Sequence, residues 1–590
     1  MKTKFLFILL LIISFIPLTD LINPGLPVTH DGQDHVARIA NFYKNLQEGV
    51  LVPRWAPNLN WGYGHPILMF LYPLPSYIAS LFHALGLSFV DSTKLVFAVA
   101  YILSGLAMFL WLKEFLSKEA AFTGSLLYIF APYRFIDLYV RGAIGEHVAF
   151  VFPPLILYFL LKLSKKYSYK YLLLGSLSLA GFILSHNAIS LMFLPIIILY
   201  AIFLISQSKN TSYVIRHTSY VLILGFALSA FFWLPAFMEG KYTLRDIVTK
   251  GGFENNFVSF HQFIYGLWNY GGSGTFSVQV GVLHWLSVLS SIPLCLYLYK
   301  KKNKLWIMTL SLLIIFVISL FLIDKNSQFI WQKFTLIQKF QFPWRFLSVA
   351  VFASSVLGAI AVSFFPKMLF KKLSDLVIPS GAIAKSRNLI PQISLLIILT
   401  VGILFLNKDY WHAKGYLYKP ESFYTSVYPG TTDTGESAPV WSVRFMEKLP
   451  KSHVEVIQGQ AEIIEGKRTA TVHQYKISNA VNAGIRENTL YFPGWRVLVD
   501  NKPVDIQYQD ANNRGVITFF VENGNHDLQI KFTQTRLRLI ADIISIGSLL
   551  VLIGLGIMNR IDYKVIKSSS HQVIKSSSHQ VIKSSSGLST

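Results

Sequence analysis

Residues 5–18 read FLFILLLIISFIPL and follow Lys2 and Lys4. The apolar run extends to residue 22 and is long enough to cross a bilayer, because a spanning helix needs about 20 residues. Basic residues at one end of such a helix favour the cytoplasmic side. The N-terminus is therefore predicted to lie inside and the following residues outside. No small-residue cleavage signal precedes Asn23-Pro24-Gly25, so the segment is predicted to stay as an anchor.

The composition extends this interpretation to the whole chain. Of its 590 residues, 53% are hydrophobic and 14% are charged, whereas soluble domains have roughly 25% charged residues. The net charge of +23 comes from lysines in short loops between apolar runs. This is the cytoplasmic bias of membrane proteins and does not indicate a nucleic-acid partner. With the single Cys295, no internal disulfide is possible.

Apolar runs of spanning length recur along the chain. They lie near residues 4–22, 94–112, 119–136, 148–163, 171–185, 187–206, 217–237, 279–299, 305–323, 346–365, 391–406 and 537–557. One further run, 67–87, contains Pro73 and Pro75, which favour a broken or re-entrant helix. If this run does not cross the membrane, every lysine-rich loop lies on the cytoplasmic side. We predict an α-helical polytopic protein of the plasma membrane with about twelve spans and both termini cytoplasmic.

The predicted topology leaves several segments outside the membrane. They are 23–93, 137–147, 238–278, 324–345 and the long segment 407–536. The last of these has short alternating runs separated by turns such as Asn523-Gly524-Asn525, a pattern typical of strands. We predict an all-β domain, a sandwich, inserted before the final span.

The C-terminal residues 558–590 contain three copies of Val-Ile-Lys-Ser-Ser-Ser. One apolar pair in each repeat cannot build a core. We predict a disordered cytoplasmic tail.

The first external segment, 23–93, begins with an acidic and histidine-rich cluster, His30-Asp31-Gly32-Gln33-Asp34-His35. It precedes a predicted interfacial helix over 34–48. Carboxylates held at the bilayer surface indicate chemistry on a lipid-linked substrate. The alternative is that Asp31 and Asp34 only favour the positive N-terminus of that helix.

Two other external segments carry similar residues. The short segment 137–147 holds Asp137, Arg141, Glu146 and His147, which offer oxygen and imidazole ligands for Mg²⁺ or Mn²⁺ and a cation for phosphate. The alternative is a surface ion pair between Arg141 and Glu146. Arg345 lies between aromatic residues at the start of a span, either as a snorkelling side chain or as a clamp on a lipid phosphate. His186 and Glu436 are weaker candidates.

The span interiors contain few ionisable residues. Apart from His284 and Asp542, such residues lie near the span ends. Ion-coupled transporters need charged groups near the midplane of the membrane. Transport driven by protons or sodium is therefore disfavoured.

Several of these motifs resemble a known family. His30-Asp31-Gly32, Pro53-Arg54-Trp55, Gly62-Tyr63-Gly64-His65-Pro66, Arg141–Glu146 and Phe342-Pro343-Trp344-Arg345 are similar to the pattern of membrane proteins labelled 6-pyruvoyl-tetrahydropterin synthase-related. Residues 491–495 resemble the C-terminal β region of YfhO-like proteins. An acidic residue after the first span, with a second acidic motif two spans later, also resembles the GT-C superfamily of membrane glycosyltransferases.

The resemblance implies a GT-C-like transmembrane domain over 1–406, the β domain over 407–536 and a final span at 537–557. It implies transfer of a sugar from a polyprenyl-phosphate carrier to an extracytoplasmic glycan, lipid or protein, in contact with membrane lipids. In such a reaction, cations stabilise the leaving phosphate and a carboxylate deprotonates the acceptor hydroxyl.

The expected site residues follow from these roles. The catalytic residues are Asp31 and Asp34, the substrate ligands are His35, Arg54, Arg141 and Arg345, and the ligands of a divalent cation, Mg²⁺ or Mn²⁺, are Asp31, Glu146 and His147. The alternative function is a non-catalytic role in envelope assembly or in transport of a lipid-linked glycan.

Overall fold

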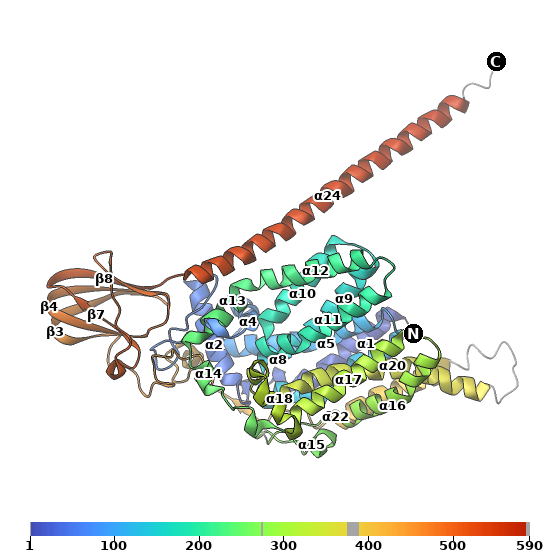
Figure 1. Cartoon of the computed structure of the whole chain (residues 1–590), viewed down its shortest axis with the longest axis horizontal. Helices are drawn as coiled ribbons and strands as arrows, with labels where there is room; N and C mark the ends of the chain where they lie inside the picture. Colours follow the sequence, from blue (N-terminus) through green and yellow to red (C-terminus); the bar gives the residue numbers. More distant parts are fainter. Residues whose placement is uncertain (1, 273–274, 375–388, 586–590) are drawn as a thin grey trace.

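The computed structural model describes the backbone of residues 2–272, 275–374 and 389–585, and the side chains of these residues except 365–374, 389–393 and 562–585. A bundle of roughly parallel helices forms the main body, and a β domain projects from one end of it (Figure 1). The N-terminus lies at the opposite end of the bundle. The N-terminus and the β domain therefore lie at opposite ends of the bundle.

The predicted spans are helices in the structure. They are α1 (Thr3–Phe15, continued by η1, Ile16–Ile22), α5 (Phe89–Leu112), α6 (Lys118–Ile129), α9 (Phe152–Lys165), α10 (Tyr169–Ser185), α11 (Asn187–Gln207), α12 (Thr211–Leu228), α16 (Val282–Lys300), α17 (Leu305–Ile323), α20 (Leu347–Ser374), α22 (Leu389–Asn407) and α24 (Arg536–Ser585).

Fewer of these helices than expected have the length of a full span. Among the described residues, eight are long and apolar enough to cross a membrane, or nine if a bent pair forms one span. That pair is α12 and α13 (Ala230–Met238), with a bend of 67° between them. Helix α6 ends at Ile129, shortly before Pro132, because a proline disfavours helical geometry in the residue before it.

The ambiguous run 67–87 is broken, as its prolines predict. It forms α3 (Ile67–Phe70) and α4 (Leu74–Ala84), separated around Pro73. Helix α4 packs against α5 and against α2 (Gly32–Gln47) in the first external segment. The broken helix therefore packs against the bundle at the end that carries the β domain.

The β domain begins later than predicted. Its strands are β3 (Val454–Arg468), β4 (Val472–Leu490), β5 (Trp495–Val499), β6 (Lys502–Val504), β7 (Val516–Val521) and β8 (Gly524–Phe532). Residues 408–453 instead return across the bundle, where β2 (Tyr416–Leu417) pairs with β1 (Leu26–Pro27). This return places part of the C-terminal segment over the first external segment.

All six strands belong to one antiparallel sheet, so the predicted sandwich of two sheets is not formed. Strand β4 pairs with β8 through Ala480 and with β7 from Ala483 onward. At this change of partner, Asn479 and Asn482 have positive φ angles of 55° and 46°. Irregularities of this kind bend a strand, which allows one sheet to curve around its own core.

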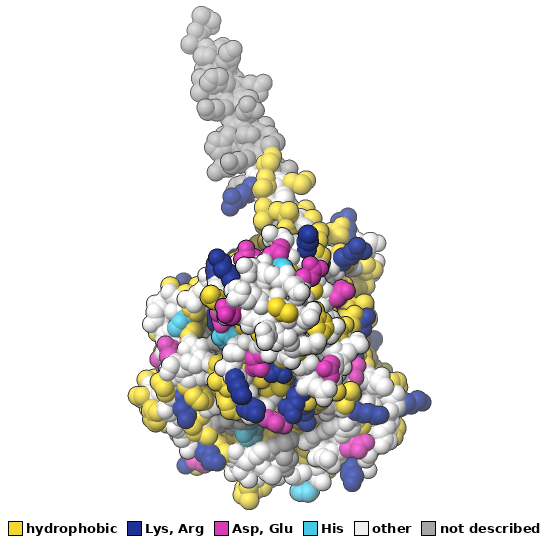
Figure 2. All heavy atoms as spheres, turned by 90° about the vertical axis from the view of Figure 1, so that its left-hand side faces the viewer, with side chains coloured by type: hydrophobic (Ala, Val, Ile, Leu, Met, Phe, Trp, Pro, Cys, Tyr) yellow, Lys and Arg dark blue, Asp and Glu magenta, His cyan; other side chains and the backbone are white. Residues whose placement is uncertain are grey.

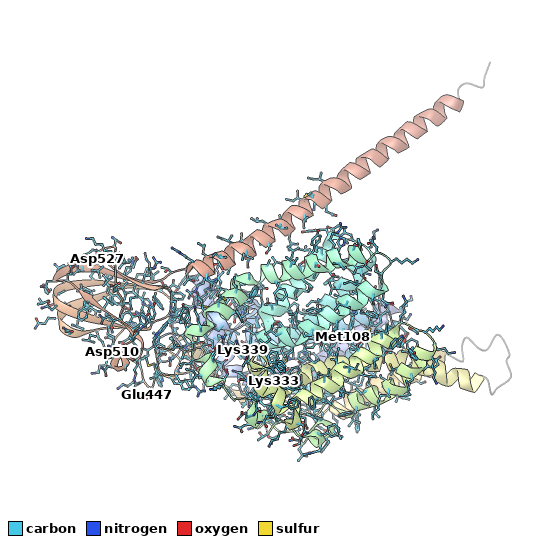
Figure 3. All side chains as sticks on the ribbon, in the orientation of Figure 1. Met108, Lys333, Lys339, Glu447, Asp510 and Asp527 are labelled. Atoms are coloured by element: carbon cyan, nitrogen blue, oxygen red, sulfur yellow. The ribbon has the colours of Figure 1, made fainter. Side chains whose placement is uncertain are left out.

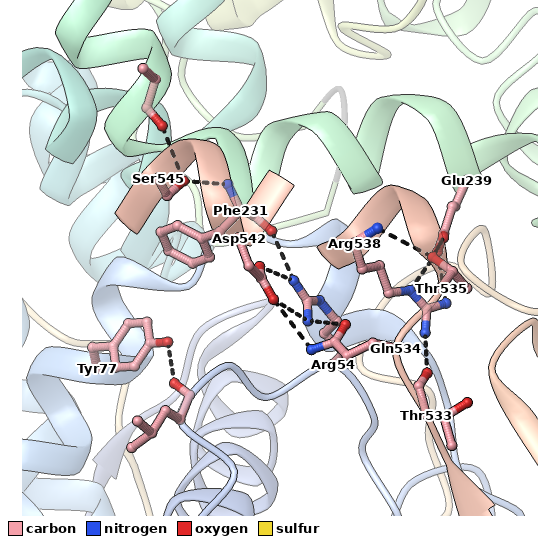
Figure 4. A network of polar contacts seen from close by, with 12 residues as sticks. Arg54, Tyr77, Phe231, Glu239, Thr533, Gln534, Thr535, Arg538, Asp542 and Ser545 are labelled. Carbon is pink, nitrogen blue, oxygen red and sulfur yellow. Dashed lines mark hydrogen bonds and ion pairs between the residues drawn. The ribbon is translucent and has the colours of Figure 1, made fainter. Parts of the chain in front are cut away.

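Two ion pairs join α24 to the bundle and to the first external segment (Figure 4). Arg54 Nη2 lies 2.7 Å from Asp542 Oδ1 on α24. Arg538 Nη2 lies 2.7 Å from Glu239 Oε2, just after α13. Beside them, the Trp55 ring meets the Trp495 ring of β5 at a centroid distance of 5.3 Å. The final helix is therefore fixed where it enters the bundle.

Helix α24 continues through the repeats to Ser585. The prediction of a disordered tail is therefore wrong for residues 558–585, and residues 586–590 lie outside the described residues. The physical reason is that adding a residue to an existing helix costs far less than starting a new one.

The end of the molecule that carries the β domain exposes acidic and basic side chains side by side (Figure 2), as a surface in water does.

Candidate functional site

The external segment between α6 and α9 is short and buried. It consists of α7 (Pro132–Phe135), a π-helical turn η2 (Ile136–Arg141) and α8 (Ile144–Ala149). Between the last two, Gly142 adopts a left-handed φ of 66°, which glycine takes more readily than other residues. The reversal at Gly142 brings the side chain of Arg141 back onto Glu146.

The carboxylate of Glu146 is completely buried and joins two arginines. Its Oε1 accepts hydrogen bonds from Arg141 Nη2 at 2.9 Å and from Arg345 Nε at 2.8 Å. Its Oε2 accepts from Arg141 Nη1 at 2.9 Å and from the Tyr133 hydroxyl at 2.8 Å. The alternative of a surface ion pair between Arg141 and Glu146 is wrong, because Glu146 is 0% exposed.

Arg345 is the member of this cluster that reaches a cavity. Its Nη1 donates to the Phe340 carbonyl at 2.8 Å, and its guanidinium lies over the Phe342 ring at 4.9 Å. Its side chain keeps 14% exposure and lines the cavity. Arg345 therefore presents a positive charge that is held rigidly on one side and open on the other.

The cavity has a volume of about 340 Å³ and two different walls. Side chains of α10, α11, α12 and α13 form an apolar wall, and external segments form a polar wall. The apolar wall includes Leu179, Phe182, Leu194, Phe226 and Trp233, and the polar wall includes Tyr72, Gln341, Arg345, Glu436 and Ser437. Lys339, at its margin, lies at the end of the bundle towards the β domain (Figure 3).

The cavity is accessible from the side of the bundle. Leu191 and Phe237 both line it, and they are 45% and 61% exposed. Exposed apolar side chains on long apolar helices are suited to contact with lipid. The rim of the cavity is therefore apolar at Leu191 and Phe237.

The first external segment meets the Arg141 segment through backbone hydrogen bonds. The Asp31 N–H donates to the Arg141 carbonyl at 2.9 Å, and the His30 N–H donates to the Val140 carbonyl at 3.0 Å. The Asp31 side chain is exposed and makes no capping hydrogen bond on α2. Asp31 stands at the N-cap position of α2, where its charge alone favours the positive helix N-terminus, so both interpretations of Asp31 stay predictions.

The neighbours of Asp31 are more buried. The Asp34 carboxylate accepts a hydrogen bond from the Tyr428 hydroxyl at 2.6 Å, and burial raises its pKa. His35 Nδ1 lies 3.0 Å from Arg38 Nη1, and burial holds the pKa of His35 well below its ordinary value. Both side chains thus have protein partners on α2 or in the C-terminal segment, and neither lines the cavity.

Tyr72 lies in the break between α3 and α4 and faces the cavity. Its ring stacks on His186 at a centroid distance of 4.9 Å, and it lines the cavity. Burial raises the pKa of the Tyr72 hydroxyl. Tyr72 and Arg345 both line the cavity.

The expected ligands of a divalent cation do not come together. His147 follows Glu146 in α8, but its ring packs against Phe97 and Tyr101, at centroid distances of 5.3 and 6.0 Å. The Glu146 oxygens already accept hydrogen bonds from two arginines and a tyrosine. Within the described ranges, no group of three or more His, Cys, Asp or Glu side chains is arranged to hold a metal ion. The residues present do not fit the predicted cation.

Arg54 also lies apart from the cavity. Besides Asp542, it donates to Gln534 at 2.9 Å and to the Phe231 carbonyl at 3.3 Å (Figure 4). The structure thus places together Arg141, Glu146 and Arg345, with Asp31 close by. It places Arg54 in the joint to α24 and His147 in the aromatic core.

The polar wall contains Glu436, which the sequence indicated only as a weaker candidate, and Tyr72 and Gln341, which it did not indicate. Glu436 Oε2 accepts a hydrogen bond from Gln341 Nε2 at 2.6 Å and from the Thr434 hydroxyl at 2.9 Å. Burial raises the pKa of Glu436. The sequence signal for Glu436 was only its place in a polar external loop, and no local pattern indicates Tyr72 or Gln341.

Comparisons with solved structures give distant likenesses. An arabinofuranosyltransferase AftD from Mycobacteria is 11% identical with a TM-score of 0.42, and the match covers 70% of this chain and 28% of that one. ArnT from Cupriavidus metallidurans bound to undecaprenyl phosphate is 12% identical with a TM-score of 0.37, covering 69% and 73%. The Archaeoglobus fulgidus oligosaccharyltransferase is 13% identical with a TM-score of 0.41, covering 72% and 58%.

Comparisons of sequence give a family. An uncharacterized protein of Lactococcus lactis subsp. cremoris (strain MG1363) is 27% identical over 243 residues, which is 39% of this chain and 39% of that protein. The family described as 6-pyruvoyl-tetrahydropterin synthase related domain, membrane protein, matches residues 68–408. That range contains the broken helix, Glu146 and Arg345. The chain belongs to this family of membrane proteins.

Proposed function

We propose that this protein is a membrane glycosyltransferase that transfers a sugar from a polyprenyl-phosphate carrier to an extracytoplasmic glycan, lipid or protein. The observation that carries the proposal is the two-sided cavity, with apolar helices on one wall and Arg345 on the other. A polyprenyl chain is apolar and its phosphate is anionic. One molecule therefore matches both walls.

The contacts of Arg345 suit a phosphate ligand. Its Nε and Nη1 are used by Glu146 and by the Phe340 carbonyl. Among the described residues, no hydrogen bond uses its Nη2. Arginine binds phosphate through charge-assisted hydrogen bonds of fixed geometry, and here Glu146 and Arg141 fix the orientation of the guanidinium.

The same placement suits the chemistry of sugar transfer. When the bond between sugar and phosphate breaks, the leaving phosphate gains negative charge, which a positioned guanidinium stabilises. The acceptor hydroxyl must lose its proton to a base. In this proposal, Asp31 is that base, because its carboxylate is exposed and makes no capping hydrogen bond, and its backbone N–H is bonded to the carbonyl of Arg141, which pairs with Glu146. No step requires the predicted divalent cation.

The proposal includes an orientation in the cell. The cavity lies at the end of the bundle that carries the β domain, and the N-terminus lies at the other end. We place the β domain outside the plasma membrane and both termini inside, as the lysine distribution favours.

A non-catalytic role is the second candidate. A protein that carries a lipid-linked glycan during envelope assembly also needs an amphipathic cavity that opens sideways, and the exposure of Leu191 and Phe237 favours such an opening. The two functions differ in one respect. Only the transferase cleaves the bond between sugar and phosphate.

The test uses purified full-length protein in lipid nanodiscs with a radiolabelled polyprenyl-phosphate hexose and a membrane extract as acceptor. The transferase releases polyprenyl phosphate and labels an acceptor. Asp31→Asn is expected to reduce that rate at least about 100-fold without lowering the melting temperature. Binding of the lipid without turnover supports the carrier role, and full activity of D31N overturns Asp31 as the base.

A further inference from the structure

The polar wall of the cavity includes part of a segment from far along the chain. We call residues 428–437 the strap, because they lie across the first external segment. The Asn60 N–H donates to the Gly430 carbonyl at 2.9 Å, and the Trp61 N–H donates to the Tyr428 carbonyl at 3.0 Å. Arg38 Nε donates to Thr432 Oγ1 at 3.2 Å. The strap is therefore fixed along its length.

The end of the strap is folded so that Glu436 faces the cavity. The Asp433 carboxylate accepts hydrogen bonds from the backbone N–H groups of Gly435 and Ser437, at 2.8 and 3.0 Å. His65 Nε2 lies 3.6 Å from Asp433 Oδ1. Held in this turn, Glu436 and Ser437 both line the cavity.

The Gln341 side chain contacts the Glu436 side chain. Gln341 lies shortly before Arg345 in the chain. Its side-chain amide donates a hydrogen bond to Glu436 Oε2 at 2.6 Å. Arg345 and Glu436 both line the cavity, so the two side chains face a common space. A carboxylate and an amide thus lie beside the guanidinium in the polar wall of the cavity.

We propose that Glu436 and Gln341, with Ser437, form a subsite that binds the hydroxyl groups of the sugar carried by the polyprenyl phosphate. The inference rests on the proposed function and adds a second contact to it. Hydroxyl groups both donate and accept hydrogen bonds, and a carboxylate, an amide and a serine together offer both. A few polar groups in an apolar cavity set the orientation of the ligand. Glu436 is a binding residue in this account, and Arg345 holds the phosphate.

The test compares two lipids in nanodiscs that contain the full-length protein. The probes are polyprenyl phosphate alone and a mixture of polyprenyl-phosphate hexoses, each radiolabelled. Glu436→Gln keeps the shape of the side chain and removes its charge. Glu447→Gln is the matched control, since Glu447 is 75% exposed and pairs with Arg514 away from the cavity.

Wild-type protein and E447Q are expected to bind the hexose lipids more tightly than the bare phosphate. E436Q is expected to lose about tenfold in affinity for the hexose lipids, because one charge-assisted hydrogen bond is lost, and to bind the bare lipid unchanged. Gln341→Ala is expected to act in the same direction. Equal loss for both lipids, or no loss, overturns the sugar subsite and leaves the phosphate site standing. If wild-type protein binds neither lipid, the proposed function itself fails.

Discussion

Glu146 and Arg345 are 199 residues apart in the chain, and their side chains meet at 2.8 Å at the polar end of the cavity. One comes from the short helix α8 and the other from the start of the span that includes α20. Neither position is explained by its local sequence. Their contact makes a buried carboxylate the support for a cation that reaches the cavity.

The first prediction concerns the stability of this pair. Glu146→Ala removes the only carboxylate shared by Arg141 and Arg345 among the described residues. Arg345 then loses its carboxylate partner and the buried Arg141, among the described carboxylates, keeps only Asp137, at 2.8 Å; breaking a buried pair of this kind costs up to about 3–5 kcal/mol. We expect a large fall in the melting temperature in detergent. Arg345→Ala should cost less, because Glu146 keeps its bidentate contact with Arg141. Equal melting temperatures for E146A and R345A would contradict this order.

A second prediction follows from the raised pKa of Glu436. As the pH rises above the ordinary value of 4.5, the unfolded chain ionises this group before the folded protein does. Stability is therefore lost with rising pH until the folded pKa is passed. E436Q lacks this effect. The melting temperature of E436Q minus that of wild type should therefore increase as the pH is raised from 4.5 to neutrality. A constant difference across this range would show that the group is not buried as described.

A third prediction concerns the divalent cation. His147→Gln keeps a side chain of similar size, and His147 packs against Phe97 and Tyr101 away from Glu146. We expect the variant to bind polyprenyl phosphate as wild type does. Titration with Mg²⁺ or Mn²⁺ should shift the melting temperatures of both proteins equally. A cation-dependent stabilisation of wild type that disappears in H147Q would restore His147 as a ligand.

The orientation of the protein gives a fourth prediction. The chain has one cysteine, Cys295, which is buried, so Cys295→Ser gives a background for labelling. In intact cells, a membrane-impermeant maleimide should label Glu447→Cys near the β domain. Lys209→Cys, between α11 and α12, should react only after the membrane is permeabilised. The reverse pattern would place the cavity on the cytoplasmic side.

The membrane helices follow from the sequence because each depends on a local run of apolar residues. The break at Pro73 and the strands of the β domain also follow from residues that are close together in the sequence. The single curved sheet was not predicted, since it depends on irregularities at Asn479 and Asn482 that bring β7 and β8 onto one strand.

The site was predicted only in part, for a related reason. Glu146 and Arg345 were selected as charged residues beside spans, but the sequence does not show that they touch. His147 was assigned to the same site as its neighbour Glu146, although adjacent residues on a helix face different directions. Glu436 reaches the cavity through the strap, whose path depends on contacts with Arg38 and His65 from a distant segment.

The central claim is that Arg345 holds the phosphate of a polyprenyl lipid in the cavity. The most direct measurement is equilibrium binding of radiolabelled polyprenyl phosphate to wild-type protein, Arg345→Ala and Lys333→Ala in nanodiscs. Lys333 is an exposed basic residue that does not line the cavity. We predict that R345A loses affinity at least about tenfold, because a charge-assisted contact is removed, and that K333A binds as wild type does. Unchanged binding by R345A, at a melting temperature showing that it is folded, would contradict the account.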